Sequence, residues 1–176
     1  MSHKIAVTGH RPQKLGGFSG PQHEFYKAAI KHYMHEFLGE KLKTIKELEC
    51  ISGMALGVDT YWAEVALELN IPLIAAVPFR NQDCKWNKND REYYKILLRK
   101  AQQIVYIDEV TKHTTKYSVL LGNYDPRKMQ ARNEWMVNNC NELLAVWNET
   151  SGGTANCVRY AKSKKTLLTI LNPRTL

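Results

Sequence analysis

The stretch that decides the fold is Ser151-Gly152-Gly153-Thr154-Ala155-Asn156, where two adjacent glycines separate two apolar segments. The segment before it, Leu143–Trp147, is typical of a buried strand, and the segment from about Thr154 to Ser163 is typical of a helix. Glycines at such a junction let the backbone approach a ligand, and the helix N-terminus adds N–H donors and a positive dipole end. The stretch therefore predicts an α/β protein that holds a phosphate, with Thr154 as the helix N-cap.

A second glycine-containing segment, Ser52-Gly53-Met54-Ala55-Leu56-Gly57-Val58-Asp59, lies at another strand-to-helix junction. Asp59 falls in the first turn of the predicted helix, whose buried face we expect to be Val58, Trp62, Val65 and Leu69. It could complement the helix dipole or accept hydrogen bonds from ribose hydroxyls. Gly53 and Gly57 could serve the backbone turn alone. Two such segments in one short chain favour a nucleotide-handling protein.

The rest of the chain alternates strand-like and helix-like segments. We expect strands at 3–8, 48–52, 71–77, 104–107, 143–147 and 166–171, with helices at about 22–38, 58–69, 89–102, 125–138 and 154–163. In helix 22–38 the residues Phe25, Ala29, Tyr33 and Phe37 recur four apart and form one apolar stripe, and residues 111–124 are expected to form a partly ordered loop. Alternation of this kind predicts one Rossmann-like α/β domain over residues 1–176, with about six mostly parallel strands and helices on both faces.

Ligands of such sheets bind beyond the carboxyl ends of the strands, where the strand order reverses. The polar chemistry of this chain gathers in the loops that follow its predicted strands. We therefore expect a single ligand site at this edge, formed by Thr8, Gly9, His10, Arg11, Ser52, Gly53, Met54, Gly57, Asp59, Pro78, Phe79, Ser151, Gly152, Gly153 and Thr154.

Length and composition set further limits. A chain of 176 residues is long enough for one well-buried core, and no linker or low-complexity tract divides it. The apolar runs are strand-sized and no signal-peptide pattern is present, so we expect neither a membrane-spanning helix nor export. The four cysteines are widely spaced, without a C-x-x-C motif or paired histidines. This pattern favours a cytoplasmic protein with reduced thiols, and without a metal or resident cofactor.

The formal net charge of +8 is compatible with an anionic partner or with an ordinary solvated surface. Nucleic acid is one candidate partner, because phosphate contacts dominate affinity in such complexes. No zinc finger, helix-turn-helix pattern or basic-aromatic stripe supports it further. Trp86 follows a polar loop and has no helical stripe to join, so it either stacks on a base or covers the core.

Four motifs resemble the SLOG superfamily, which joins Smf/DprA proteins, Lonely Guy phosphoribohydrolases and YpsA-like proteins. They are Val7–Pro12, Ser52–Asp59, Ile74–Phe79 with Trp86 shortly after, and Ser151–Thr154. The opening Val7-Thr8-Gly9-His10-Arg11-Pro12 is most similar to the YpsA-like branch. The resemblance covers nearly the whole chain and implies a Rossmann-like fold, nucleotide-type ligands and self-association into a homo-oligomer.

The Lonely Guy enzymes provide a second comparison. Met129-Gln130-Ala131-Arg132-Asn133 resembles their M-x-x-R-K segment, and this resemblance implies that Arg132 acts in the site. Their glycine loop reads P-G-G-x-G-T-x-x-E with a catalytic glutamate, and alignment on Gly152-Gly153 places Arg159 at that position. Cleavage of an N-glycosidic bond needs a carboxylate, which arginine cannot replace. The departure argues against phosphoribohydrolase activity.

Three functions remain open. The first is a module that binds a nucleotide or an ADP-ribose-type molecule, as a sensor or sequestering protein. The second is an enzyme that hydrolyses nucleoside monophosphates, with Asp59, Glu64 or Glu134 supplying the carboxylate. The third is single-stranded DNA binding, by analogy with Smf/DprA and from the positive charge.

Overall fold

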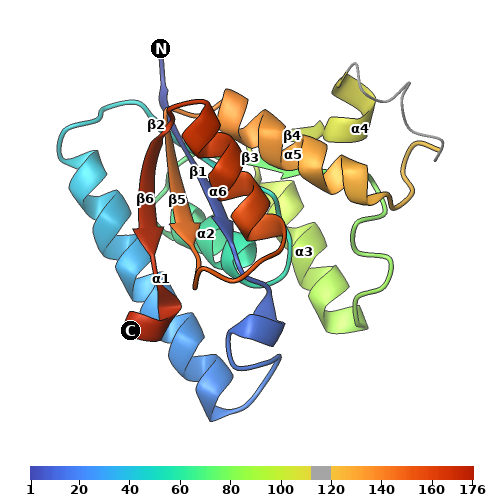
Figure 1. The fold of residues 1–176 in the computed structure, drawn as a ribbon, viewed down its shortest axis with the longest axis horizontal. Coiled ribbons are helices and arrows are strands. Elements are labelled where there is room, and N and C mark those ends of the chain that lie inside the picture. Colours follow the sequence, from blue (N-terminus) through green and yellow to red (C-terminus); the bar gives the residue numbers. More distant parts are fainter. Residues whose placement is uncertain (112–119) are drawn as a thin grey trace.

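Six strands form one parallel sheet in the computed structural model, which describes residues 1–111 and 120–176 (Figure 1). The strand order is β4-β3-β2-β1-β5-β6, and every neighbouring pair is parallel. The strands are β1 (His3–Gly9), β2 (Leu48–Ser52), β3 (Leu73–Val77), β4 (Gln103–Tyr106), β5 (Glu142–Val146) and β6 (Leu167–Leu171). The predicted α/β class and the six parallel strands are confirmed.

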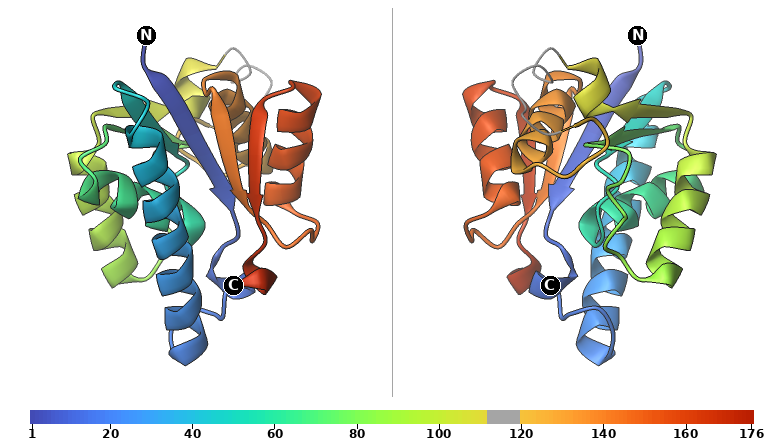
Figure 2. Two further views of the ribbon diagram at one scale, coloured as in Figure 1. Left: turned by 90° about the vertical axis from the view of Figure 1, so that its left-hand side faces the viewer. Right: turned by 90° about the vertical axis from the view of Figure 1, so that its right-hand side faces the viewer.

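Helices cover both faces of the sheet (Figure 2). Buried side chains of α1, α2 and α3 belong to core clusters on one face, and those of α5 and α6 to the cluster on the other. The helices are α1 (Pro21–Leu42), α2 (Val58–Glu68), α3 (Lys88–Lys100), the single turn α4 (Ile107–Val110), α5 (Pro126–Asn138) and α6 (Gly153–Ser163), with short 3₁₀ turns at Pro12–Lys14 and Pro173–Thr175.

The central strand shows how the two layers share the sheet. Ile5 and Val7 of β1 pack among residues of α1 and α2, whereas Ala6 packs among residues of α5 and α6. Successive side chains of a strand point to opposite faces, so a strand covered on both sides is apolar throughout. This accounts for the continuous apolar runs that predicted buried strands.

The predicted apolar stripe of α1 lies at the flank of the core, and a neighbouring row of residues is the buried one. The buried residues of α1 are Ile30, Met34 and Leu38, while Phe25 is 53% exposed. Tyr33 and Phe37 lie at the flank of the same cluster, where Phe37 meets the buried Trp62 with ring centroids 6.3 Å apart. Two adjacent rows of α1 both repeat every four residues, and the aliphatic row packs against the sheet. On α2 the predicted face is confirmed, since Val58, Trp62 and Val65 are buried.

The strand order places a topological switch point between β1 and β5. The chain adds β2, β3 and β4 on one side of β1, then returns to add β5 and β6 on the other. Gly9 pairs with Val146, so the carboxyl ends of β1 and β5 lie side by side. The connections after these two strands lead to α1 and α6, which lie on opposite faces, and such a divergence opens a crevice where ligands bind.

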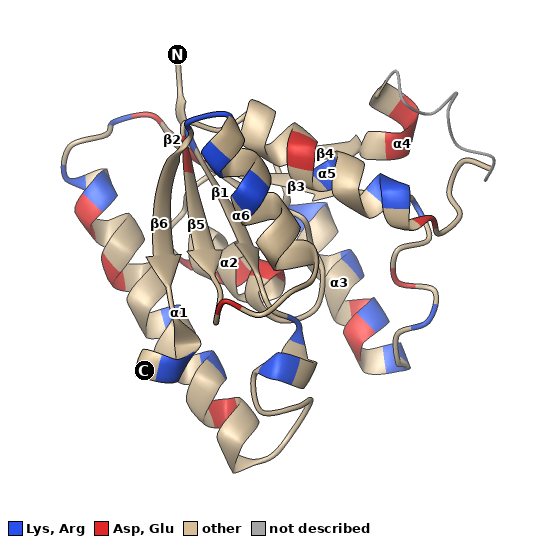
Figure 3. Ribbon diagram, viewed as in Figure 1, with Lys and Arg blue, Asp and Glu red and all other residues tan. Residues whose placement is uncertain are grey.

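Charged residues are spread over the surface. Helices α1, α3 and α5 each carry both basic and acidic residues, whereas the charged residues of α6 are all basic (Figure 3). None of the helices within the described ranges is long and apolar enough to cross a membrane. The expected loop at 111–124 falls largely on residues 112–119, which lie outside the described residues.

Candidate functional site

A cleft of about 590 Å³ lies at the carboxyl ends of β1 and β5, between the segment after β1, α5 and the start of α6. The lining of this cleft comes from four segments that are far apart in the sequence. Nine residues expected at the site line this cleft: Thr8, Gly9, His10, Arg11, Asp59, Arg132, Gly152, Gly153 and Thr154. The structure thus brings together residues from the loops after β1, β2 and β5 and from α5.

The loop between β5 and α6 presents backbone to the cleft. Gly152 is the N-cap of α6 and has φ = 137°, a conformation that disfavours any residue with a Cβ. The prediction that Thr154 is the N-cap is wrong, because the helix already begins at Gly153. The N–H groups of the first helical residues have no acceptor within the helix, so they can donate hydrogen bonds to a ligand at the N-terminus of α6. A Cβ built on Gly153 meets no heavy atom within 4 Å, so this position faces open space.

Lys14 ties the segment after β1 to this loop. Its Nζ donates hydrogen bonds to Thr150 Oγ1 at 2.7 Å and to the Ser151 carbonyl at 3.0 Å. The residue lines the cleft and brings a positive charge beside Gly152. Sequence reasoning missed Lys14, because a lysine in a polar loop gives no signal of a partner 136 residues away. Ser151 is exposed and does not line the cleft, although its carbonyl holds Lys14 in place.

The loop after β2 is organised around Arg132. The guanidinium donates to the Gly53 carbonyl at 2.7 Å, and its Nη1 lies 3.8 Å from Asp59 Oδ2. A Cβ on Gly53 would overlap Arg132 Nη1 and crowd Asp59 Oδ2, so a larger residue there would displace this pair of side chains. Both charged side chains are buried, and Asp59 also accepts the Ala55 N–H at 3.3 Å. Asp59 and Arg132 therefore form one pair on the floor of the cleft.

Burial shifts the pKa of both Asp59 and Arg132. Desolvation raises the pKa of Asp59, and the nearby Arg132 guanidinium opposes that shift. Desolvation likewise lowers the pKa of Arg132, and Asp59 opposes it. Each charge is thus held in the interior by the other, and removal of either would leave its partner buried and unpaired.

Ser52, Met54 and Gly57 of the β2 loop shape the backbone around Asp59 and do not contact the cleft. Ser52 Oγ donates to the Asp59 carbonyl at 2.7 Å and accepts the Met54 N–H at 3.1 Å. Met54 has φ = 58° and its side chain belongs to the core cluster under α3. Gly57 lies against the backbone carbonyl of His10. These residues, expected as ligand contacts, do not line the cleft.

His10 lies in the cleft with a defined role for one ring nitrogen. Nε2 accepts a hydrogen bond from the Asn148 backbone N–H at 3.0 Å, which requires an unprotonated nitrogen there. Burial lowers the pKa of His10, and the positive charges of Lys14 and Arg174 act in the same direction. The imidazole is therefore neutral at neutral pH and links the loops after β1 and β5.

Pro78 and Phe79, at the end of β3, do not line the cleft. Both are buried; the Pro78 carbonyl accepts the Asp108 N–H at 3.2 Å. Phe79 packs edge-to-face on Tyr124 with ring centroids 6.0 Å apart, and Tyr124 lines the cleft. Lys128 is fully buried and donates to Asp108 Oδ2 at 3.0 Å. Pro78, Phe79 and Lys128 pack behind one wall of the cleft and do not contact the space inside it.

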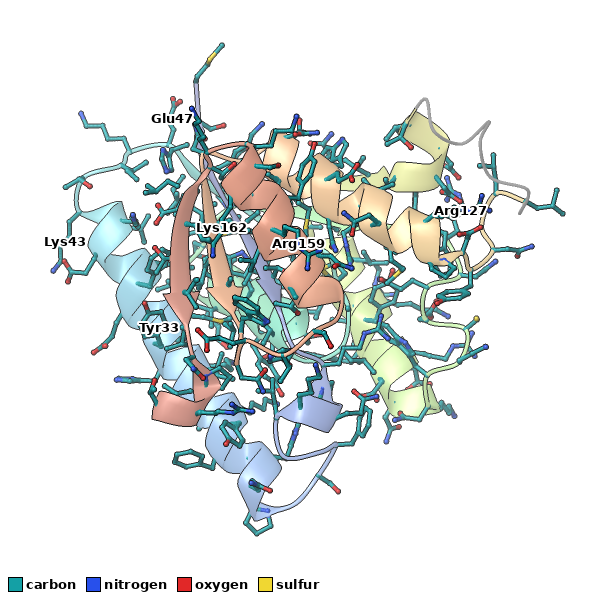
Figure 4. All side chains as sticks on the ribbon, viewed as in Figure 1. Tyr33, Lys43, Glu47, Arg127, Arg159 and Lys162 are labelled. Carbon is teal, nitrogen blue, oxygen red and sulfur yellow. The ribbon has the colours of Figure 1, made fainter. Side chains whose placement is uncertain are left out.

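The charges in the cleft favour an anion. Arg11, Lys14 and Arg132 line it, and among residues 1–111 and 120–176 Asp59 is the acidic residue that does so. Arg159 lies on α6 outside the cleft lining and donates to Asn156 Oδ1 at 3.1 Å (Figure 4). Within the described part of the chain, no group of three or more His, Cys, Asp or Glu side chains is placed to hold a metal ion.

The fold and the cleft define a class: a doubly wound parallel α/β protein with an anion-suited cleft at its switch point. Comparison with known families places it more closely, since the model of the YspA SLOG family matches residues 5–169. The chain belongs to this family. It is 35% identical over 117 residues to the uncharacterized SPbeta prophage-derived protein YoqJ of Bacillus subtilis (strain 168), covering 64% of this chain and 68% of that protein. It is 31% identical over 168 residues to a UPF0398 protein of Bacillus cereus (strain AH820), covering 92% and 83%.

Solved structures show the same fold at low sequence identity. DNA processing protein A (DprA) of Streptococcus pneumoniae superposes with a TM-score of 0.65 and 16% identity, over 97% of this chain and 50% of that one. DprA of Helicobacter pylori, whose structure addresses its single-stranded DNA binding mode, superposes with a TM-score of 0.61 and 18% identity, over 97% and 65%. The chain thus spans half to two thirds of these proteins. The similarity establishes the fold.

Proposed function

We propose that this protein binds a nucleotide or a nucleotide-derived molecule of the ADP-ribose type in the cleft between β1 and β5, as a sensor or sequestering module. The phosphate lies against the N-terminus of α6, and Arg11 and Lys14 supply positive charge. Asp59 and the polar side chains of α5 face the sugar. A cytoplasmic location and self-association are further parts of the proposal.

The main support for this proposal is the environment of the α6 N-terminus. The start of α6 opens into the largest cleft described here, with Gly153 facing open space and Lys14 beside Gly152. A helix N-terminus attracts anions through its free N–H groups and its dipole, and a neighbouring lysine adds a charge-assisted contact. The same combination on one edge of a parallel sheet supports recognition of phosphate.

Hydrolysis of an N-glycosidic bond is the second candidate, and Asp59 is the observation that favours it. Asp59 is a carboxylic acid within the cleft, and burial raises its pKa as in many general acids. Its Oδ2 is already engaged by the Ala55 N–H and lies close to Arg132, which limits its freedom to serve a substrate. Glu64 binds Lys31 at 2.9 Å and Glu134 accepts from Gln130 at 3.2 Å, and neither lines the cleft. Binding without turnover therefore fits the geometry better.

The experiment is a ligand screen with two readouts. Small molecules released from freshly purified protein are identified by mass spectrometry, and a nucleotide panel is then tested by thermal unfolding. At a hundredfold excess over Kd, one-site binding adds about 2.7 kcal/mol, which corresponds to roughly 5–10 °C in a domain of this size. Stabilisation by at least one nucleotide is expected, without release of free base. Release of base by the wild-type protein would instead support the hydrolase, and the absence of any shift would contradict nucleotide binding.

Single-stranded DNA binding is tested in the same preparation. Contacts to several phosphates make affinity fall steeply with salt, whereas binding of a small nucleotide depends on salt weakly. We expect oligonucleotide binding to be weak at physiological salt. Tight binding with a steep salt dependence would favour the nucleic-acid function over the small-molecule one.

A further inference from the structure

A second hollow region adjoins the cleft and is lined by aromatic side chains. It consists of two neighbouring hollows of about 130 and 380 Å³ that share Pro12, Phe18, Leu56, Trp86 and Asp90. We refer to this region as the aromatic groove. Arg11 and Gln13 line both the larger hollow and the phosphate-suited cleft, so the groove continues from the cleft along one edge of the molecule.

Phe18 is a large apolar residue that lies outside the hydrophobic core. Its side chain is 56% exposed, although it lies in a loop with a defined shape. His23 Nδ1 donates to the Gly17 carbonyl at 2.7 Å and fixes the loop against the start of α1. Phe18 lines both hollows and stacks on no other ring among the described residues, so its ring is available to a planar ligand.

Trp86 is a second aromatic residue in the lining of both hollows, and a core residue supports its ring. Its ring packs edge-to-face on the buried Tyr94, with centroids 5.1 Å apart. Gln82 reaches Tyr94 and the carbonyl of Met54, which joins this support to the loop after β2. Trp86 is half-buried, so part of the indole remains available to the groove. The ring therefore covers the core and also offers a surface for stacking.

The charges around the groove fit a ligand that carries phosphate. Arg11 and Lys85 line the larger hollow, and Lys27 lines the smaller one. Two acidic residues are present, but Glu64 is engaged by Lys31 at 2.9 Å and by the Tyr93 hydroxyl at 2.8 Å. Asp90 accepts from Asn87 Nδ2 at 2.6 Å as part of the start of α3. Cations thus mark the path from the cleft into the groove.

We infer that the aromatic groove binds the nucleobase of the ligand whose phosphates occupy the cleft. This inference rests on the proposed function and extends it to a ligand class: a nucleotide with a phosphate chain long enough to pass Arg11 and Gln13, such as ADP-ribose or a dinucleotide. Stacking on Phe18 and Trp86 provides affinity for the base, and the α6 N-terminus provides affinity for the phosphates.

Calorimetric titration of the full chain tests the groove, with ADP-ribose as the base-containing probe and ribose 5-phosphate as the probe without a base. Phe18→Ala should weaken ADP-ribose binding at least about fivefold, the low end of a base–aromatic stack. The same variant should bind ribose 5-phosphate as the wild type does. Phe25→Ala is the matched control, since Phe25 is equally exposed and lines neither the groove nor the cleft.

A second variant uses the indole as a reporter. Trp86→Phe keeps an aromatic surface, so ADP-ribose affinity should stay within about twofold. The ligand-induced change in tryptophan fluorescence should become smaller by the part that comes from Trp86, while Trp147, which donates to the Thr150 carbonyl, still reports on the phosphate loop. Wild-type affinity for ADP-ribose in Phe18→Ala, or a fluorescence change as large in Trp86→Phe as in the wild type, would overturn the groove and leave the proposed function intact. If the wild type binds no nucleotide, both the proposed function and the role of the groove are contradicted. Phe18-dependent binding of a thymidine oligonucleotide in place of ADP-ribose would overturn the small-molecule ligand.

Discussion

The two glycine-containing loops of this chain share a sequence pattern and differ in what surrounds them. At Gly53, after β2, the space that a side chain would take is filled by Arg132 and Asp59. At Gly153, after β5, that space is open and belongs to the cleft. The first loop uses its backbone to hold the protein's own cation, and the second leaves its backbone free. A glycine turn before a helix therefore marks a ligand site only when nothing within the protein already occupies it.

Removal of the cation at the first loop should have the largest effect. Arg132→Met removes the 2.7 Å hydrogen bond to the Gly53 carbonyl and leaves Asp59 buried without its counter-charge, which costs about 3–5 kcal/mol of unfolding free energy. Denaturant unfolding measures the loss. A loss below about 1 kcal/mol would show that the β2 loop does not depend on Arg132.

The same variant makes a prediction about pH. Burial raises the pKa of Asp59 in the folded state, so its contribution to stability is present at low pH and is lost as pH rises through that pKa. Without Arg132 to oppose the shift, this loss becomes larger. The deficit of Arg132→Met relative to the wild type should be greater at pH 8 than at pH 5, and the reverse order would contradict the pairing of Asp59 with Arg132.

Alanine at the two glycines compares the loops directly. Gly53→Ala forces a Cβ into Arg132 and should cost about 1–3 kcal/mol, as overpacking does elsewhere. Gly153→Ala should change stability by less than about 0.5 kcal/mol, because its Cβ meets nothing. Gly39→Ala, within α1 and equally unobstructed, is a control expected to stabilise by about 0.5–1 kcal/mol. Equal costs at Gly53 and Gly153 would remove the distinction between the loops.

A smaller effect is expected at His10. Its pKa is lowered by burial, so its contribution to stability is present above the unfolded pKa near 6.5 and is lost as pH falls through the folded pKa. Protonation also breaks the hydrogen bond from Asn148, worth about 1 kcal/mol. Between pH 7.5 and pH 5, His10→Gln should therefore lose less stability than the wild type. An identical pH dependence in the two proteins would show that His10 is not buried in its neutral form.

The smallest effect concerns the contact between the segment after β1 and the loop after β5. Lys14→Met removes two exposed hydrogen bonds and should lower the unfolding free energy by about 0.5 kcal/mol. Amide exchange at Thr150 and Gly152 should accelerate, because the loop loses its tie. Unchanged exchange there would mean that Lys14 does not restrain the loop.

Much of the fold followed from local patterns. Apolar runs such as Leu143–Trp147 predict buried strands, and their alternation with helices predicts the parallel sheet and the edge where the loops meet. The four-residue period does not distinguish adjacent rows of one helix: it predicts an apolar stripe through Tyr33 and Phe37, whereas Met34 and Leu38 belong to the buried row.

The site was predicted at the level of loops and missed at the level of side chains. Sequence located Gly53 and Gly153 at equivalent junctions, but occupation of one by Arg132 depends on a contact across 79 residues. Lys14 and the aromatic groove likewise depend on contacts between distant segments, which have no local pattern. Thr154 was placed as an N-cap because threonine favours that position, yet Gly152 has the backbone conformation that ends the loop.

The central claim is that the free loop at Gly152-Gly153 receives a phosphate, and Gly153→Asp tests it most directly. A carboxylate in the first turn of α6 stabilises the helix by about 0.3–1 kcal/mol and repels an anion at the same place. Calorimetric titration with ADP-ribose should show binding to the wild type and at least tenfold weaker binding to Gly153→Asp, whose Tm is unchanged or higher. Equal affinity in the two proteins would contradict a phosphate at the α6 N-terminus.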